Sequence, residues 1–309
     1  MTHRDRPQNH HRGVQTGAGR AERYRLRRSL APVVRHVLLA AVVIACLVPF
    51  YWMGISALKD NSQIFARPMQ WWPHPVQWWP HPVQWDNVRR ALNYPGFPFL
   101  RFLWNSAFYA GLVSLGTVLS CAAVGYGFAR LHFPGRNLLF ALTVSTMLIP
   151  GIVIFIPTFV LFKHLGLLGT YAPLIVPAFL GNAFFIFLLR QFFLGLPQEL
   201  SDAARVDGAG EFRIFWQIML PLVRPALMVA ALLIFIWTWH EFFGPLIYLS
   251  DRSQYPLSLG LFAFRAQHTT EWGLLMAAST LATLPLVGLF FCTQRAFLEG
   301  MTLTGIKGS

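Results

Sequence analysis

The sequence predicts an all-α, polytopic membrane protein with six transmembrane helices. Hydrophobic residues make up 55% of the chain and charged residues 12%, with a mean hydropathy of +0.49, and this composition exceeds what one globular core needs. The charges are also spaced so that six long apolar windows remain. A helix that rises about 1.5 Å per residue crosses a hydrocarbon core about 30 Å thick with about 20 residues, so each window can span a membrane once.

Five of these windows contain no Asp, Glu, Lys or Arg over at least 22 residues, and the sixth is interrupted only by His240 and Glu241. The charge-free windows are Val37–Leu58, Phe102–Ala129, Asn137–Phe162, His164–Leu189 and Trp272–Gln294, and the interrupted one is Ala226–Ser250. The helices predicted within them cover about 35–58, 103–129, 138–162, 171–189, 226–249 and 272–294.

The N-terminal region is strongly basic. The first 36 residues hold nine arginines and few apolar residues, which predicts a disordered cytoplasmic tail over residues 1–32 and a transmembrane domain over 33–309. The first apolar window is too long for a cleaved signal and no small-residue cleavage site follows Leu58, so we expect it to remain as an anchor. An orienting basic flank explains the arginines better than nucleic-acid binding, so no nucleic-acid partner is expected.

The Lys and Arg residues predict the orientation of the chain. With the N-terminus inside, cytoplasmic segments hold 17 of them and outer loops 8, as the positive-inside rule requires. The whole excess lies in the tail, because without its nine arginines each side holds 8, but Arg130 and Arg136 also crowd one short loop. We therefore expect a multi-pass protein of the cytoplasmic membrane with both termini in the cytoplasm. The segment between spans four and five then faces the cytoplasm as well.

That cytoplasmic segment, residues 195–225, predicts two short helices around a glycine turn. Pro197 suits the first turn of a helix, and Glu199 and Asp202 place negative charge near the positive end of its dipole. Asp207 and Gly208 supply a left-handed stop.

A second helix is expected to begin near Glu211, and Pro221 and Pro225 then turn the chain back into the membrane. Four residues spaced i, i+3, i+4 and i+7 predict an apolar stripe that lies against the bundle: Phe212, Phe215, Trp216 and Met219. The small residues Ala203, Ala204 and Gly208 are expected where another protein can approach closely. The segment is therefore predicted to be a docking element.

The spacing of this segment resembles a known signature. Asp202-Ala203-Ala204, Gly208 after three residues and Ile218-Met219-Leu220-Pro221 after nine more resemble the EAA motif, E-A-A-x3-G-x9-I-x-L-P, of membrane subunits of ATP-binding-cassette importers. FPGR at 133–136, LLRQFF at 188–193, EWGLLMA at 271–277 and QRAFLEGMTLTGIKG at 294–308 resemble the maltose-type branch of sugar permeases. Two positions depart from the pattern, since Asp202 replaces Glu and His240 replaces Asn.

The resemblance implies a permease subunit of an ATP-driven, binding-protein-dependent importer that moves a carbohydrate by alternating access. It also implies four kinds of partner: the lipid bilayer, two cytoplasmic ATP-binding subunits, a second permease and an extracytoplasmic sugar-binding protein. The second permease is a homologue or an identical copy. The coupling loop, our name for residues 195–225, would sit in a cleft of the ATPase. Its implied contact residues are Glu199, Asp202, Ala203, Ala204, Asp207, Gly208, Ile218, Leu220 and Pro221.

No catalytic, cofactor-binding or metal site is expected in the chain itself. A nucleotide-binding loop of the Walker A type needs Gly-Lys-Ser or Gly-Lys-Thr, and none of Lys59, Lys163 and Lys307 follows a glycine. HEFFG at 240–244 begins like a zinc-protease motif but lacks the second histidine. Cys46, Cys121 and Cys292 fall within predicted spans, where they are read as packing residues. The chain is therefore predicted to be a transport subunit without its own ATPase site.

A candidate translocation path is predicted near the end of the fifth span. Glu241 is the one acid within a span, and a carboxylate at that depth faces the bundle interior or pairs with an arginine of the partner subunit or with Arg252. Trp237 and Trp239 either stack on a sugar or anchor the helix at the interface. Together with the neighbouring His240, these residues form the candidate path.

The first outer loop, residues 59–101, contains the heptapeptide WWPHPVQ twice in succession, at 71–77 and 78–84. Its prolines forbid a regular helix, so we expect it at the outer membrane surface or against a binding protein. His74 and His81 lack carboxylate or thiol neighbours that would complete a metal site.

Two other transport functions stay open. The first is a secondary transporter or channel without an ATPase, which commonly shows inverted repeats or several buried ionisable groups. The second is an importer of the same family that carries a polyol or a glycerol phosphate ester.

Overall fold

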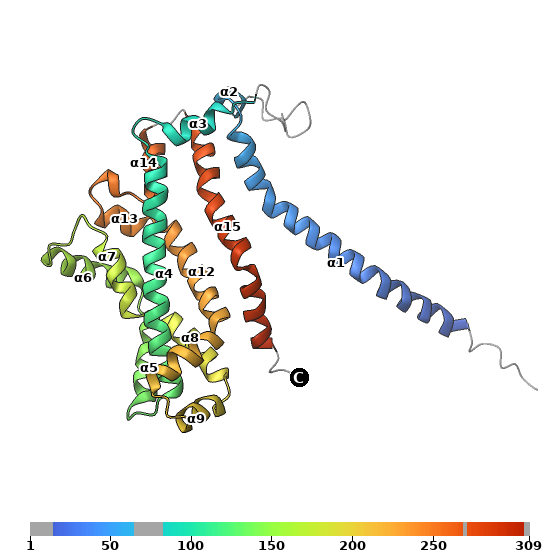
Figure 1. The fold of residues 1–309 in the computed structure, drawn as a ribbon. Helices are drawn as coiled ribbons and strands as arrows, with labels where there is room; N and C mark the ends of the chain where they lie inside the picture. Colours follow the sequence, from blue (N-terminus) through green and yellow to red (C-terminus); the bar gives the residue numbers. More distant parts are fainter. Residues whose placement is uncertain (1–14, 65–82, 268–270, 306–309) are drawn as a thin grey trace, which may run out of the picture. The chain divides into compact units, whose positions relative to one another are not determined.

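The computed structural model describes residues 15–64, 83–267 and 271–305 (Figure 1). Every regular element in these ranges is a helix, which confirms the all-α prediction. The α-helices are α1 (Gln15–Ser56), α2 (Asn61–Ile64), α3 (Asp86–Asn93), α4 (Phe99–Arg130), α5 (Arg136–Ser145), α6 (Gly151–His164), α7 (Ala172–Ile175), α8 (Ala183–Gly195), α9 (Glu199–Val206), α10 (Glu211–Arg213), α11 (Leu220–Leu222), α12 (Arg224–His240), α13 (Phe243–Tyr248), α14 (Leu257–Gln267) and α15 (Trp272–Gly305). Short 3₁₀ helices are η1 (Thr146–Leu148), η2 (Val176–Leu180) and η4 (Arg252–Gln254), and η3 (Ile214–Met219) is a π-helix.

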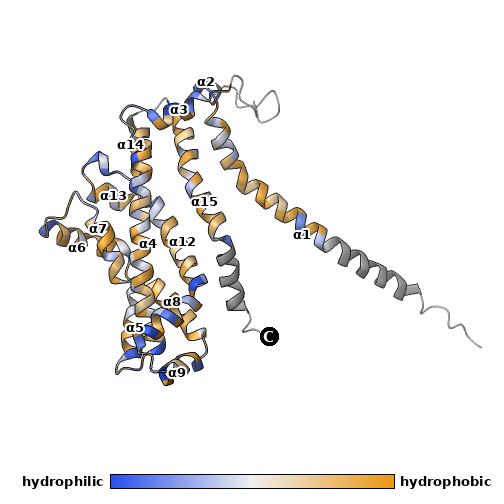
Figure 2. Ribbon diagram, in the orientation of Figure 1, coloured by the Kyte–Doolittle hydropathy of each residue, from blue (hydrophilic) through white to orange (hydrophobic). Residues whose placement is uncertain are grey.

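The described helices account for the predicted spans. Four stretches, Pro32–Ser56, Phe99–Arg130, Ala172–Gly195 and Trp272–Gln294, are long and apolar enough to cross a membrane, and two bent pairs raise the number to six if each pair is one span. Figure 2 shows apolar residues along α4, α12 and α15, with polar residues around α3 and α9. Each predicted window overlaps a span or a bent pair, but the first half of the second pair, Glu211–Leu222, belongs to residues 195–225 and lies outside the predicted window Ala226–Ser250.

Helix α1 belongs to a unit that is described by itself, Met1–Ile55. Its backbone is helical from Gln15 onward, whereas the basic composition predicted a disordered tail to residue 32. The stretch AERYRLRRSL is rich in Ala, Arg and Leu, which are strong helix formers, so a helix is compatible with it. Residues 1–14 lie outside the described residues, as do both copies of WWPHPVQ except for Val83 and Gln84.

The third span is broken, whereas the sequence predicted one helix over 138–162. The pair Arg136–Leu148 and Gly151–His164 is bent by 98°. Pro150 lacks an N–H and restricts the residue before it, and Ile149 accordingly adopts an extended conformation with φ −80° and ψ 118°. Pro157, in contrast, is accommodated within α6.

The fifth span is shorter than the predicted 226–249. Helix α12 ends at His240, and Glu241 adopts an extended conformation with φ −62° and ψ 127° before α13 begins. The cause lies four residues further on, because Pro245 has no N–H to donate to the Glu241 carbonyl and its ring clashes with that carbonyl in a continuous helix. The Ser258 hydroxyl donates to this carbonyl instead, at 2.7 Å.

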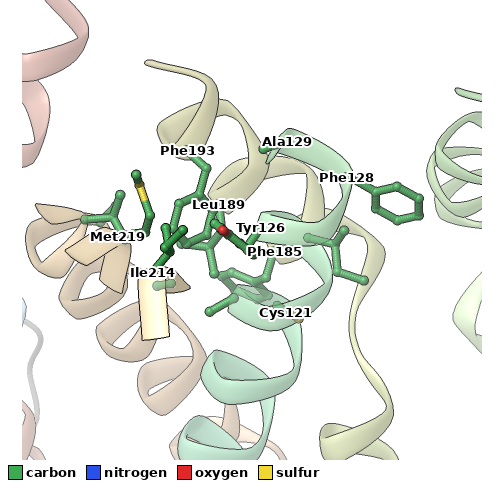
Figure 3. Close-up of a cluster of buried hydrophobic side chains, with 14 of the residues drawn as sticks. Cys121, Tyr126, Phe128, Ala129, Phe185, Leu189, Phe193, Ile214 and Met219 are labelled. Atoms are coloured by element: carbon green, nitrogen blue, oxygen red, sulfur yellow. The ribbon is translucent and has the colours of Figure 1, made fainter. Parts of the chain in front are cut away.

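Helix α4 is the central element of the bundle formed by residues 56–309. It packs along α8 and α12, and α12 in turn packs along α15. The half of the bundle that includes α9 contains one continuous hydrophobic cluster (Figure 3). The labelled members of this cluster are Cys121, Tyr126, Phe128, Ala129, Phe185, Leu189, Phe193, Ile214 and Met219. A second cluster joins α3, α4, α14 and α15 around Phe97, Phe102 and Phe264.

Gly125 permits the close packing of α4 on α8. A Cβ atom at this position would lie 3.1 Å from the backbone nitrogen of Arg190 and 3.3 Å from the carbonyl oxygen of Ile186. Both contacts are with backbone, which cannot rotate away, so any larger side chain separates the helices. Small residues serve this purpose in many membrane-helix interfaces.

We predict that Gly125→Val destabilises the bundle by about 1 to 3 kcal/mol, the usual cost of overpacking. Gly127→Val is the matched control, because a Cβ atom there has nothing within 4 Å. Thermal unfolding of the two purified variants in detergent measures the difference. A lowered Tm is expected for Gly125→Val alone, and equal Tm values for both variants would contradict the close packing.

Candidate functional site

The coupling loop contains a rigid turn at Gly208. Helix α9 ends at Val206, and Gly208 has a φ of +78°, in the left-handed region that favours glycine. The Ala209 N–H donates to the Ala204 carbonyl at 2.9 Å and the Gly208 N–H to the Arg205 carbonyl at 3.0 Å. These two bonds form a Schellman motif, so the turn lies where the sequence predicted the left-handed stop.

The second half of the loop differs from the prediction. Ile214 and Met219 are fully buried, whereas Phe212 is 78% exposed and Trp216 is 53% exposed, with their rings stacked at 6.3 Å. The predicted apolar stripe is therefore wrong at Phe212 and Trp216. The reason is the π-helix η3, whose i→i+5 bonding places residues five apart, such as 214 and 219, on one face.

The small residues of α9 are divided between two faces. Ala203 and Gly208 are exposed, as predicted, but Ala204 is only 7% exposed and packs in the hydrophobic cluster of the bundle. The prediction that all three face another protein is wrong for Ala204. Helix α9 has one face against the bundle and one exposed face, so only part of the motif is accessible to another protein.

Charged side chains connect the two halves of the coupling loop. Arg205 forms ion pairs with Asp202, at 2.7 Å, and with Glu211, at 2.9 Å. The hydrogen bond to Glu211 and the nearby carboxylates raise the pKa of the Arg205 guanidinium above its usual value. The second Glu211 oxygen accepts a hydrogen bond from the Tyr126 hydroxyl of α4 at 2.8 Å. The loop is thus connected across its turn and to the bundle.

Arg130, the last residue of α4, holds the start of the loop. Its guanidinium is buried and donates to the carbonyl oxygens of Phe193 and Leu196, at 2.7 and 2.6 Å, and to the Gln198 side chain at 2.5 Å. In the sequence, this arginine indicated only the orientation of the chain, and its contact with the loop was not predicted. Its partners are mainly backbone carbonyls, which leave no signal in the sequence. The position of Arg130 in the last turn of α4 was the one available sign.

Large apolar side chains remain exposed on this connected loop. Val206 is 88% exposed, and Phe212 and Trp216 project outward as described above. Grouped exposed apolar residues of this size commonly mark protein interfaces. The motif residues Ile218 and Leu220 are half-buried and Pro221 is exposed, while Glu199, Asp202 and Asp207 lie on the exposed surface.

The residues of the candidate translocation path are not brought together. Trp237 is 58% exposed and packs near Phe184 and Phe185, whereas Trp239 is 5% exposed and stacks on Phe235 in the second cluster. His240 is exposed at the end of α12. Glu241 lines a pocket together with the polar residues Tyr109, Thr158 and Tyr248.

Glu241 lies in the break between α12 and α13. One carboxylate oxygen accepts the Gly244 N–H at 2.9 Å, while the other, Oε2, is buried without a hydrogen-bond partner in the described structure. The ion pairs found in the described ranges do not include Glu241. The bundle-interior alternative fits this geometry, whereas a pairing with an arginine of a partner subunit stays a prediction.

Among the described residues, no group of three or more His, Cys, Asp or Glu residues could hold a metal ion. Cys46, Cys121 and Cys292 are free thiols.

Known proteins resemble the chain in sequence and fold. Residues 116–302 match the family described as the binding-protein-dependent transport system inner membrane component. The chain is 30% identical to the lactose transport system permease of Rhizobium radiobacter, over 89% of this chain and 97% of the relative. It is 33% identical to the sn-glycerol-3-phosphate transport system permease of Yersinia enterocolitica, over 86% of this chain and 94% of the relative.

A solved structure shows the same fold. It is the crystal structure of a bacterial ABC transporter involved in the import of the acidic polysaccharide alginate, with a TM-score of 0.74 and 22% identity, over 88% of this chain and 98% of that one. The bundle and the sequence matches together define a multi-pass membrane transport subunit. The chain belongs to the family of binding-protein-dependent transport system inner membrane components. Its members are permeases that work with a separate ATP-binding subunit and a substrate-binding protein.

We predict that Arg130→Lys weakens the attachment of the coupling loop, because a single ammonium group cannot reach all three acceptors. Loss of charge-assisted hydrogen bonds is expected to cost about 2 to 3 kcal/mol and to lower Tm. Arg136→Lys is the matched control, since Arg136 makes one such bond, to the Leu131 carbonyl at 3.0 Å. Equal Tm shifts in the two variants would show that Arg130 has no special role.

Proposed function

We propose that the chain is the permease subunit of an ATP-driven importer that moves a carbohydrate across the cytoplasmic membrane by alternating access. Its membership of the binding-protein-dependent family supports the transport mechanism. The relative named for lactose transport supports a carbohydrate as cargo. The relative named for sn-glycerol-3-phosphate keeps a glycerol phosphate ester as the second candidate.

The observation that carries the coupling role is the set of apolar side chains on a loop whose backbone is fixed. Val206, Phe212 and Trp216 are exposed on the coupling loop, while its polar groups are engaged with α4 and with one another. A surface of this kind can transmit a displacement to the bundle, because the loop and α4, to which it is bonded, move together. The proposed partner at this surface is an ATP-binding subunit.

The proposed assembly contains two cytoplasmic ATP-binding subunits, a second permease and an extracytoplasmic sugar-binding protein. The N- and C-termini and the coupling loop lie in the cytoplasm. The chain contributes no catalytic group. The permease has two conformations in the proposed transport cycle. ATP-driven closure of the ATP-binding subunits shifts the equilibrium between them only by the difference in affinity of those subunits for the two conformations. The loop residues named from the motif are proposed to make that contact, except for the buried Ala204.

The energy source separates this proposal from a secondary transporter. We expect uptake by vesicles that contain the full assembly to stop when internal ATP is removed and to continue when ion gradients are collapsed. The measurement is accumulation of labelled sugar under each condition. Uptake by the chain alone, driven by an ion gradient, would favour a secondary transporter.

We predict that Gly208→Val abolishes coupled uptake. A β-branched residue at a φ of +78° strains the backbone by about 1 to 3 kcal/mol and displaces the turn. Gly210→Val is the matched control, because Gly210 has φ −71° and ψ 160°, which valine adopts freely, and neither site has an atom within 4 Å of an added Cβ. Sugar uptake and ATP hydrolysis are measured at equal expression. Normal uptake by Gly208→Val would contradict the assignment of the loop.

A further inference from the structure

A pocket of about 360 Å³ lies where α4, α6, α7 and α13 meet. Its volume falls within the range of about 300 to 1,000 Å³ that is typical of small-molecule sites. Six of the residues that line it carry the argument: Tyr109, Phe155, Thr158, Leu174, Glu241 and Tyr248. All of them belong to the bundle formed by residues 56–309.

Two polar atoms at this pocket have no hydrogen-bond partner in the described structure. They are Oε2 of Glu241 and the hydroxyl of Tyr248, and both are buried. Buried polar atoms are nearly always bonded, so an unbonded pair at one pocket calls for a partner that the chain does not supply. A carboxylate and a hydroxyl together can accept from, and donate to, the hydroxyl groups of a ligand.

Gly244 leaves room for this carboxylate. A Cβ atom at residue 244 would lie 2.9 Å from Oε2 of Glu241 and 2.9 Å from a methyl carbon of Leu174. Any larger residue would therefore push the carboxylate out of place. The other oxygen of Glu241 is fixed by the Gly244 N–H, so the group has one anchored oxygen and one that lacks a partner.

Four aromatic residues line the pocket: Tyr109, Phe155, Phe243 and Tyr248. Phe155 contacts both Phe243 and Tyr248, with ring centroids 5.0 and 5.5 Å apart. Aromatic rings offer flat apolar faces beside polar groups. A sugar ring presents the matching surfaces, with C–H groups on its faces and hydroxyl groups at its edge.

The charge of the pocket distinguishes between the two candidate cargoes. The residues that line it include an acid but no Lys, Arg or His. A carboxylate without a cation repels a phosphate or a uronate and accepts hydrogen bonds from neutral hydroxyl groups. Lipid is an equally poor occupant, because an acid is costly in contact with hydrocarbon.

We propose that this pocket is a binding site for an uncharged carbohydrate and that Glu241 excludes anionic substrates from it. The inference rests on the proposed function, because it places a cargo site within that permease. Glu241 binds a sugar hydroxyl through Oε2, Tyr248 contributes a second hydrogen bond, and the aromatic rings pack against the sugar. Selection for neutral cargo is thus made partly in the membrane.

The test is equilibrium binding of labelled probes to the permeases and their ATP-binding subunits in lipid nanodiscs. The binding protein is left out, so that it does not bind the probes itself. The probes are labelled lactose, maltose and sn-glycerol 3-phosphate. We expect at least one neutral disaccharide to bind and glycerol phosphate to bind with a much lower affinity. Glu241→Gln should weaken neutral-sugar binding by about tenfold or more, as loss of a hydrogen bond to a charged group does. It should also reduce the discrimination against glycerol phosphate.

Tyr248→Phe removes the second unpartnered group without breaking a bond of the described structure, and it should weaken sugar binding several-fold. Glu271→Gln is the matched control, because it makes the same change of charge at an exposed ion pair with Arg90, and it should leave both affinities unchanged. The ratio of neutral to anionic binding is the decisive readout, since a purely structural role for Glu241 would lower both affinities together.

Three results would overturn the site: no binding of either disaccharide, preferred binding of glycerol phosphate, or equal effects of Glu241→Gln and Glu271→Gln. ATP-dependent uptake is measured with the same preparation. If uptake still requires ATP while the pocket variants bind normally, this pocket is excluded and the proposed function stands. If wild-type uptake is independent of ATP, the proposed function itself fails.

Discussion

The attachment of the coupling loop to the C-terminal end of α4 is the constraint on which the rest of the arrangement depends. Arg130 holds the entry of the loop through two backbone carbonyls and Gln198, and Tyr126, one turn earlier, holds Glu211 beyond the Gly208 turn. Both halves of the loop are therefore bound to a single helix. Because these bonds are short and partly buried, the loop cannot tilt without moving α4 or breaking them.

Helix α4 is also long enough to reach the pocket at Glu241. It is continuous over 32 residues, and the 17 residues from Tyr126 back to Tyr109 correspond to about 25 Å along the axis. Tyr109 lines the pocket and Tyr126 holds the loop. A displacement of the coupling loop is thus conveyed by a rigid helix. This connection offers a physical link between the proposed ATPase contact and the proposed cargo site, without a chain of intermediate side chains.

The sequence predicts the spans well because the length of an apolar window depends on the thickness of the bilayer and not on contacts with other helices. The Gly208 turn was equally predictable, since a positive φ has a residue preference of its own. The breaks before Pro150 and Pro245 were not, because a proline in a span either kinks or interrupts the helix according to its surroundings. The exposure of Phe212 and Trp216 depends on a π-helix, and the role of Arg130 on carbonyl acceptors, and neither leaves a pattern of residue types.

The break in the third span has a consequence for what must surround the protein in the membrane. Pro150 lies near the middle of that apolar window, where Leu148 is 84% exposed and Ile149 is 47% exposed. Hydrocarbon cannot satisfy the peptide groups of an interrupted helix, so such a backbone persists only beside other protein or water. The interrupted backbone near Leu148 and Ile149 therefore needs water or a further protein surface beside it within the membrane.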